Sequence, residues 1–375
     1  AMSCDAASSS PSSSMAVRTL LRVASICAMT SAMTTSLCWK PALSGGTVVL
    51  AATVWMRESI GSPRATTRSA AVSAPSMLPM WATVALPANE GEQFTHLLDG
   101  GPALDMWYRW DAGFYATIAT EGYKWYNNRA PDGDMAFLPL YPTAVRAVMT
   151  VSGCGFSPYL STCATVAGLI VSNIALLSAC FVLYAVAARH IGNDGALVAV
   201  LLLLVAPNAI FLSGVYTESL FLLLALLTFY ALGRGAFAWA VFCACLAALT
   251  RSVGIALVPA LLYAAWERTS GTRGERLRVF FASWQTYAAL LPTLVFGGYV
   301  LFAGYTVGQP LAYFSSYEIV WERDIGRAPW DTLLSYFNGQ PVSFWGYHRS
   351  WIDLLAFVGG VAMAVWALRK DRAWG

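Results

Sequence analysis

Long apolar segments separated by short polar insertions dominate the chain from residue 160 onward. Because about 20 apolar residues span a bilayer as a helix, the run at 160–188 is long enough to cross with some tilt. Further runs cover 196–212, 217–232, 237–250, 253–266, 280–305 and 351–368. Weaker candidates for a first crossing lie at 44–56 and at 70–86, the second interrupted by two prolines. The pattern predicts an all-α polytopic membrane protein with about eight transmembrane helices.

Two pairs of these runs are short and meet at a polar break. Residues 213–216 separate 196–212 from 217–232, and Arg251 with Ser252 separates 237–250 from 253–266. Short helices that meet at a polar break usually line a cavity, because the freed backbone groups need partners there. The two breaks therefore predict a polar site within an apolar bundle.

Composition supports a membrane protein and divides the chain. Apolar residues make up 57% of the 375 and charged residues 11%, with a mean hydropathy of +0.56, whereas soluble domains carry roughly 25% charged residues. Continuous apolar runs exclude a barrel of alternating strands, and a net charge of +3 gives no reason to expect nucleic acid. Residues 1–70, rich in Ser, Ala and Thr, suit a targeting or poorly ordered extension. We expect a multispanning domain at 71–368, with outer loops at 87–157 and 306–350 and a cytosolic tail at 369–375.

Basic residues in short loops predict which face lies in the cytosol. Arginines crowd the segment 267–278 and basic residues the tail after 368, so both are predicted to be cytosolic. Alternating crossings then place the loops 87–157 and 306–350 and Arg251 on the opposite face. Nearly every acid after residue 90 falls on that face as well. The non-cytosolic face is therefore the predicted active face.

The stretch 107–142 gathers acids among aromatic residues, a composition that suits the membrane–water boundary. Asp111 lies between aromatic residues, where desolvation raises a carboxyl pKa and allows it to act as a general base; the alternative is a helix N-cap. Glu121, near the end of the helix expected after Asp111, is either functional or a solvated surface charge. Two prolines, Pro139 and Pro142, predict a rigid turn that fixes where the preceding acids point.

The polar breaks supply the remaining candidates. Glu218 lies between two apolar runs, and a carboxylate there suggests a function, either holding a sugar hydroxyl or pairing with a cation; the alternative is a helix cap. Arg251 needs an anion, either a lipid phosphate or Glu218. Residues 308–330 predict an amphipathic segment with aromatics toward lipid and acids toward water, which covers the cavity or brings Arg323 to a phosphate.

The eight cysteines show no metal-ligand spacing. Cys154 and Cys163 flank the end of the loop at 87–157, where they either form a disulfide on an oxidising side or remain free. Cys243 and Cys245 lie within an apolar run and suit a role as small packing residues.

Five blocks in register resemble the PIG-V family, the second mannosyltransferase of GPI-anchor assembly, and its prokaryotic relatives. They are W-D-A-G-F-Y-x-x-I-A-x-x-G-Y at 110–123, A-F-L-P-L-Y-P at 136–142, V-Y-T-E-S-L-F at 215–221, L-T-R-S-V-G at 249–254 and G-Q-P-L-A-Y-F at 308–314. The resemblance implies a GT-C glycosyltransferase fold and an inverting transfer of mannose from dolichyl-phosphate mannose. The implied acceptor is a GPI-anchor precursor, and the implied linkage is α-1,6 on the lumenal face.

The resemblance also implies residue roles and a location. Asp111 becomes the expected catalytic base, with Arg251 and Arg323 near the departing lipid phosphate. No cofactor is expected besides the lipid-linked donor as substrate, and the need for a metal stays open, because the acids allow one but show no dedicated ligand spacing. The partners are membrane lipid, the lipid-linked sugar donor, a glycolipid acceptor and an accessory membrane subunit. The location is the endoplasmic reticulum membrane, or the plasma membrane if the chain is prokaryotic. The predicted substrate-binding residues are Arg109, Trp110, Glu121, Tyr123, Tyr216, Glu218, Arg251, Trp321 and Arg323.

Two other functions stay open. One is a different GT-C transferase that uses another polyprenyl-phosphate sugar on a cell-envelope acceptor. The other is a secondary transporter, which broken helices and buried charges would suit, although no internal repeat relates the two halves of the chain. A non-catalytic relative that serves as an assembly subunit is a further alternative.

Overall fold

In a computed structural model, the described residues are 98, 104, 106–108, 110–123, 133–154, 160–206 and 209–321, with single positions at 334, 358, 359 and 362. All the regular structure within these ranges is helical. Several predictions fall outside them: both candidate first crossings, most of 351–368, the cytosolic tail, and the side chains of Arg109, Trp321 and Arg323.

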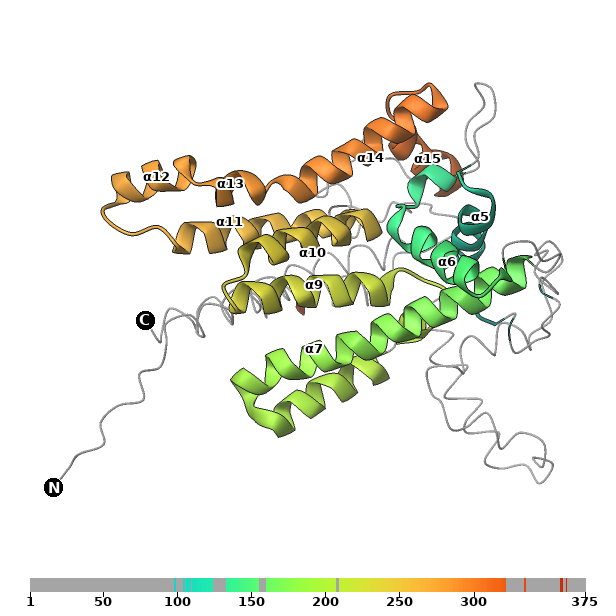
Figure 1. Cartoon of the computed structure of the whole chain (residues 1–375), viewed down its shortest axis with the longest axis horizontal. Helices are drawn as coiled ribbons and strands as arrows, with labels where there is room; N and C mark the ends of the chain where they lie inside the picture. Colours follow the sequence, from blue (N-terminus) through green and yellow to red (C-terminus); the bar gives the residue numbers. More distant parts are fainter. Residues whose placement is uncertain are drawn as a thin grey trace.

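Figure 1 shows the helices as an elongated bundle with a cap of shorter helices at one end. The elements, in chain order, are α5 (Ala112–Glu121), the 3-10 turn η2 (Asp134–Ala136), α6 (Leu140–Val151), α7 (Leu160–Val205), α8 (Ala209–Ser213), α9 (Glu218–Gly233), α10 (Phe237–Thr250), the 3-10 helix η4 (Ser252–Leu257), α11 (Val258–Glu267), α12 (Arg273–Ala282), α13 (Trp284–Ala288), α14 (Leu291–Val307) and α15 (Ala312–Trp321).

The helix α7 is a hairpin (Figure 1) that contains the predicted run at 160–188 and the first part of the run at 196–212. The chain reverses at Gly192, whose φ of 73° lies in the left-handed region that glycine adopts without strain. The return arm ends at Val205, and α8 continues separately at Ala209. The predicted run at 196–212 is therefore two helical pieces.

The predicted run at 280–305 is also divided. The chain forms α12, α13 and α14 there, and Pro292 sits in the first turn of α14, where its missing N–H costs nothing. The predicted run at 253–266 begins as the 3-10 helix η4 before α11. The runs at 217–232 and 237–250 match α9 and α10 closely.

Two helical stretches within the described residues are long and apolar enough to cross a membrane, Ser161–Val205 and Trp284–Val307. Three shorter apolar helices accompany them: Glu218–Gly233, Phe237–Thr250 and Ser252–Glu267. A total of eight transmembrane helices stays a prediction.

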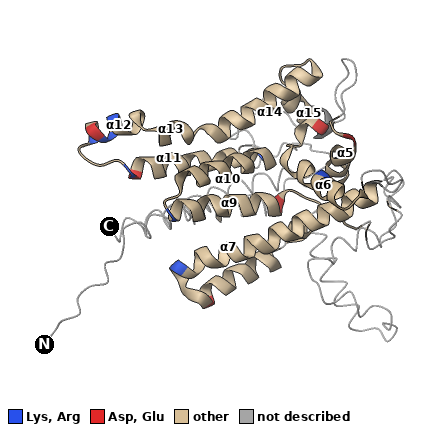
Figure 2. Ribbon diagram, in the orientation of Figure 1, with Lys and Arg blue, Asp and Glu red and all other residues tan. Residues whose placement is uncertain are grey.

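The two ends of the bundle differ in what they carry. The α7 hairpin turn, the α9–α10 turn and α12 lie at one end, where Lys and Arg colouring gathers in Figure 2. The cap of α5, α6 and α15 lies at the opposite end, next to the start of α9 and the end of α10. The arginine-rich turns therefore lie at the end of the bundle opposite α5 (Figure 1), and which end faces the cytosol stays a prediction.

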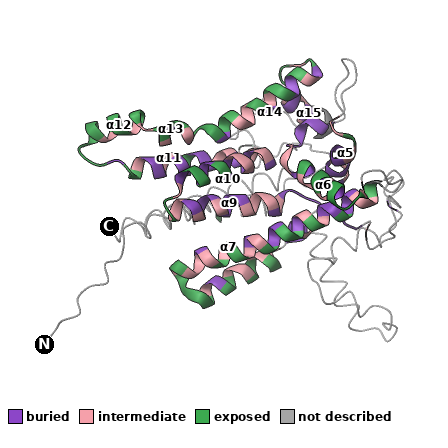
Figure 3. Ribbon diagram, viewed as in Figure 1, coloured by how far each residue is buried: buried purple, intermediate pink, exposed green. Residues whose placement is uncertain are grey.

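Small residues bring the central helices together. Ala240, Ala244 and Ala247 on α10 are fully buried against α9, α11 and α14, and small side chains at such contacts let helix backbones approach closely. The outer surfaces of α7 and α14 expose large aliphatic side chains, as Figure 3 shows by their green outer faces. The bundle is thus held by small residues inside and presents hydrocarbon outside.

Candidate active site at the junction of α5, α9 and α10

The site begins directly before α5 with a residue whose backbone has a left-handed conformation. Trp110 has φ 52°, a strained conformation for a bulky residue, and it turns the chain directly before α5. Its ring lies 6.2 Å from that of Phe211, between α8 and the cap. Asp111 follows at the N-cap position with helical backbone angles, and its side chain makes no capping hydrogen bond. Asp111 therefore occupies the N-cap position of the alternative interpretation, without the side-chain hydrogen bond that is typical of a cap.

The two polar breaks meet in space through an ion pair. Arg251 sits where α10 ends in an extended conformation, and its Nη1 pairs with Glu218 Oε1 at the start of α9. The same Nη1 donates to Thr217 Oγ1 at 2.8 Å. The Arg251 and Glu218 side chains are 18% and 27% exposed. Two partners were predicted for Arg251, a lipid phosphate and Glu218, and in the structure Arg251 pairs with Glu218.

The second carboxylate oxygen of Glu218, Oε2, is not the oxygen that pairs with Arg251. Oε2 is buried and receives no hydrogen bond in the described part of the chain. A buried carboxylate oxygen without a donor is costly, and such atoms are uncommon outside functional sites. Glu218 therefore retains an unused acceptor beside the ion pair.

Tyr115 links α5 to this pair. It lies one helical turn after Asp111, and its hydroxyl is 3.5 Å from Thr217 Oγ1. Burial raises the pKa of Tyr115 well above 10.0; the Arg251 charge opposes that rise, while the Glu218 and Asp111 charges add to it. Tyr115 therefore connects the helix that begins after Asp111 to Thr217, which also accepts a hydrogen bond from Arg251.

A close backbone contact fixes the position of Arg251. A Cβ on Gly254 would lie 2.4 Å from the backbone nitrogen of Ala248, so only glycine allows η4 to fold back against α10. The Gly254 N–H donates to the Arg251 carbonyl at 2.8 Å. The turn that follows Arg251 therefore depends on a missing side chain.

Hydrogen bonds from α6 and α7 hold the segment before Glu218. The buried Tyr141 hydroxyl lies 2.8 Å from Ser172 Oγ, which in turn donates to the Tyr216 carbonyl at 3.2 Å. The Tyr216 ring packs edge-on against Phe211 and Tyr115. Tyr216 is thus fixed from two sides beside the ion pair.

Tyr123 and Glu121 lie away from the ion pair. The Tyr123 hydroxyl donates to the Phe137 carbonyl at 2.8 Å, and Tyr299 on α14 donates to the same carbonyl at 2.7 Å. Glu121 is exposed at the far end of α5, about 15 Å along the helix from Asp111. Their roles as substrate contacts stay predictions.

The predicted amphipathic segment forms α15, but its aromatic face was assigned wrongly. Tyr313 is 2% exposed and packs against Phe296 and Tyr299 of α14. Tyr317 donates to the Ala136 carbonyl at 3.2 Å. These rings face protein and not lipid, because α15 covers η2.

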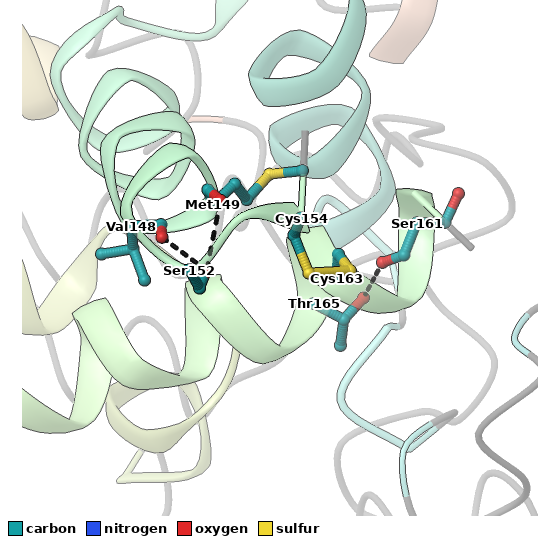
Figure 4. Close-up of a disulfide and its surroundings, with 7 residues drawn as sticks. All are labelled: Val148, Met149, Ser152, Cys154, Ser161, Cys163 and Thr165. Carbon is teal, nitrogen blue, oxygen red and sulfur yellow. Dashed lines mark hydrogen bonds between the residues drawn. A yellow bond between two sulfur atoms is a disulfide. The ribbon is translucent and has the colours of Figure 1, made fainter. Parts of the chain in front are cut away.

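A disulfide joins Cys154 to Cys163 between α6 and α7 (Figure 4), as one of the two alternatives predicted. Cys243 is buried and free, in agreement with a packing role. The sequence did not bring Tyr115 forward, and Asp134, one of the acids of the stretch 107–142, is buried in η2. The signal for Tyr115 was its spacing of four from Asp111, which places both on one face of a helix.

No group of three or more potential metal ligands occurs in the described ranges, and the need for a metal stays untested. A family model described as Mannosyltransferase (PIG-V) matches residues 99–330. That match includes α5 to α15 and therefore every residue of the site just described. Neither a curated protein nor a solved structure matches the chain.

Proposed function

The chain belongs to the mannosyltransferase (PIG-V) family, and from that premise we propose that it transfers mannose from dolichyl-phosphate mannose to a GPI-anchor precursor. Family membership and the apolar helices make it a membrane mannosyltransferase. The proposal adds the donor, the acceptor, the α-1,6 linkage of the second mannose and the lumenal face of the endoplasmic reticulum.

The observation that carries the proposal is the Arg251–Glu218 ion pair, with Tyr115 of α5 beside Thr217 and Asp111 one helical turn before Tyr115. A transfer with inversion needs a base on the acceptor hydroxyl and positive charge near the departing phosphate. Asp111 stands directly before α5, and a carboxylate at this position is suited to the first role. Arg251, at the end of α10, supplies a positive charge that Glu218 holds in place. Arg323 is the second predicted cation.

The reaction follows from these two groups. Asp111 takes the proton of the acceptor hydroxyl while that oxygen attacks the anomeric carbon of the mannosyl donor. The bond from the anomeric carbon to the phosphate oxygen breaks, and the electron pair leaves with dolichyl phosphate. The proton on Asp111 then passes to solvent, which restores the base. Holding both lipid-borne substrates in one site contributes much of the rate, because the attack becomes effectively unimolecular.

Glu218 has two tasks in this proposal. Its Oε1 holds the Arg251 guanidinium, which would otherwise be an uncompensated charge in an apolar bundle. Its Oε2, buried and without a donor, is suited to accept a hydrogen bond from a sugar hydroxyl. Tyr216 lies two residues before Glu218, and the Trp110 and Tyr216 rings both pack against Phe211.

The disulfide supports the proposed side of the membrane. Disulfides persist in oxidising compartments such as the lumen of the endoplasmic reticulum. Cys154 and Cys163 join α6 to α7, and both of these helices pack on α5. An oxidising environment for the disulfide is therefore also the environment of Asp111.

The deciding experiment is a transfer assay in membranes with radiolabelled dolichyl-phosphate mannose and a panel of glycolipid acceptors. Asp111→Asn should lose at least about 100-fold in turnover, the usual contribution of a general base, while retaining substrate binding. Asp194→Asn is the matched control, since Asp194 is an exposed acid on the α7 turn at the other end.

Three outcomes contradict parts of the proposal. Turnover of Asp111→Asn like that of the wild type removes Asp111 from the role of base. Turnover only with another polyprenyl-phosphate sugar favours a different GT-C transferase. Substrate flux across vesicles without any glycosyl transfer favours a transporter.

A further inference from the structure

Three arginines from three separate turns gather at the end of the bundle away from Asp111. Arg189 comes from the α7 hairpin, Arg234 from the α9–α10 turn and Arg268 from the end of α11. The Cζ atoms of Arg189 and Arg234 lie 5.3 Å and 5.2 Å from the centre of the same Tyr230 ring. Arg268 stacks on Phe237 at 5.2 Å and donates to the Gly235 carbonyl at 2.9 Å, which brings it to the same turn.

Aromatic rings and neutral oxygens hold these guanidinium groups in place. Arg234 Nη2 donates to the Tyr230 hydroxyl at 2.8 Å, and Arg268 bonds only a carbonyl. None of the three pairs with a carboxylate in the part of the chain that the structure describes. Two guanidinium groups on one ring repel each other, and ring contacts do not cancel that charge. An anion bound at this turn would cancel the charge.

More positive charge surrounds the cluster. The next helix, α12, buries none of its residues, and Figure 3 draws most of it as exposed. Its Glu275 is engaged in a capping box with Thr272. Arg276 stacks on the Trp266 ring at 4.5 Å. The arginines at this end are Arg189, Arg234, Arg268, Arg273, Arg276 and Arg278, against the acids Asp194, Glu267 and Glu275.

Exposed aromatic residues show at what depth of a bilayer the cluster lies. Trp239 in the first turn of α10 is 66% exposed, and Trp284 and Tyr287 on α13 are 56% and 61% exposed. Tryptophan and tyrosine prefer the headgroup region at either membrane surface. The helix that follows α13, α14, exposes aliphatic side chains such as Leu294. The cluster therefore stands at the level of lipid phosphates.

We propose that Arg189, Arg234 and Arg268 form a binding site for the phosphate groups of anionic phospholipids in the leaflet opposite the proposed active site. A guanidinium group matches a phosphate with paired N–H donors. The negative surface potential of an anionic leaflet adds attraction for each arginine near it. Lipid bound there bridges α7, α9 and α11, so it stabilises the bundle.

The test compares the full-length chain in nanodiscs of phosphatidylcholine with the chain in nanodiscs that also contain phosphatidylserine. Phosphatidylserine should raise the apparent melting temperature of the wild type. The combined variant R189Q/R234Q/R268Q should lose about 5–10 °C of that gain. The matched control is R146Q, because Arg146 is an exposed arginine on α6 at the other end, bonded to the Thr120 carbonyl.

Other results would overturn the site. Phosphatidylserine that stabilises the triple variant as much as the wild type places lipid binding elsewhere. An equal gain from inorganic phosphate in phosphatidylcholine nanodiscs assigns the cluster to a soluble anion. If the triple variant does not fold, native mass spectrometry decides between the outcomes. The wild type should retain phosphatidylserine in preference to phosphatidylcholine. The variant R189K/R234K/R268K keeps the charge but loses the planar stacking, and it should retain less phosphatidylserine than the wild type. Equal retention of the two lipids, or retention unchanged by the lysine variant, refutes the site. This proposal does not depend on the identity of the sugar donor.

Discussion

Glu218→Gln removes the carboxylate from the Arg251–Glu218 pair and leaves a guanidinium group that is only 18% exposed. Breaking a fully buried pair by removing one partner costs about 3–5 kcal/mol, and an exposed pair contributes about 0–1 kcal/mol. With exposures of 18% and 27%, this pair falls between those limits, so we expect a loss of about 2 kcal/mol. For a bundle of this size that corresponds to a fall of roughly 4–8 °C in apparent melting temperature.

Arg251→Met and the double variant Glu218→Gln/Arg251→Met complete a double-mutant cycle. The single variants each leave one buried polar partner, whereas the double variant leaves neither charge, so its loss should be smaller than the sum of the single losses by about 2 kcal/mol. The assay is thermal unfolding of the purified chain in one lipid composition, followed by intrinsic fluorescence. Glu267→Gln, an exposed acid at the end of α11, should change stability by less than about 0.5 kcal/mol. Additive losses in the cycle would show that the two side chains do not interact and would refute the proposed junction of α9 and α10.

Three further predictions concern the support around this pair. Gly254→Ala should cost at least about 2 kcal/mol and lower transfer activity, because its Cβ would meet the backbone of Ala248 at 2.4 Å; normal melting and activity would contradict the close contact. Replacing Cys154 and Cys163 by serine should cost about 2–3 kcal/mol, measured as a lower melting temperature that dithiothreitol does not lower further. Burial holds the pKa of Tyr115 above 10.0 in the folded chain, so its stabilising effect is complete below pH 10 and declines as the pH rises above that value; Tyr115→Phe should make the alkaline fall in melting temperature shallower.

The sequence predicted the helices best where an apolar run ends at a polar or glycine residue. The run at 237–250 is α10, and the run at 217–232 differs from α9 by one residue at each end. The division of 280–305 into α13 and α14 was missed, although Pro292 marks the first turn of α14. The 3-10 start of the run at 253–266 depends on the contact of Gly254 with α10, and local periodicity carries no signal for such a contact.

Side-chain direction was harder to predict than helix position. Tyr313 was expected to face lipid, yet it packs against Tyr299 and Phe296 of α14. In a soluble protein an apolar face indicates the core, but a membrane protein has hydrocarbon on both sides of such a helix. Hydrophobicity alone therefore does not separate lipid-facing from protein-facing rings, and the contacts of α15 with η2 decide the matter.

In the candidate site, the sequence predicted the charged residues and missed some of the neutral ones. The physical reason is that a charge is costly in an apolar bundle. Glu218 and Arg251 stand out in the sequence because a charge between apolar runs needs a partner or a function, and the structure shows that they are partners. Tyr141 and Ser172 fix the neighbouring Tyr216 but look like ordinary residues of their helices, since a hydroxyl can bond within its own helix at little cost. Charged residues therefore show from the sequence where a membrane site lies, and the neutral residues that give it its geometry become visible only when the helices are packed.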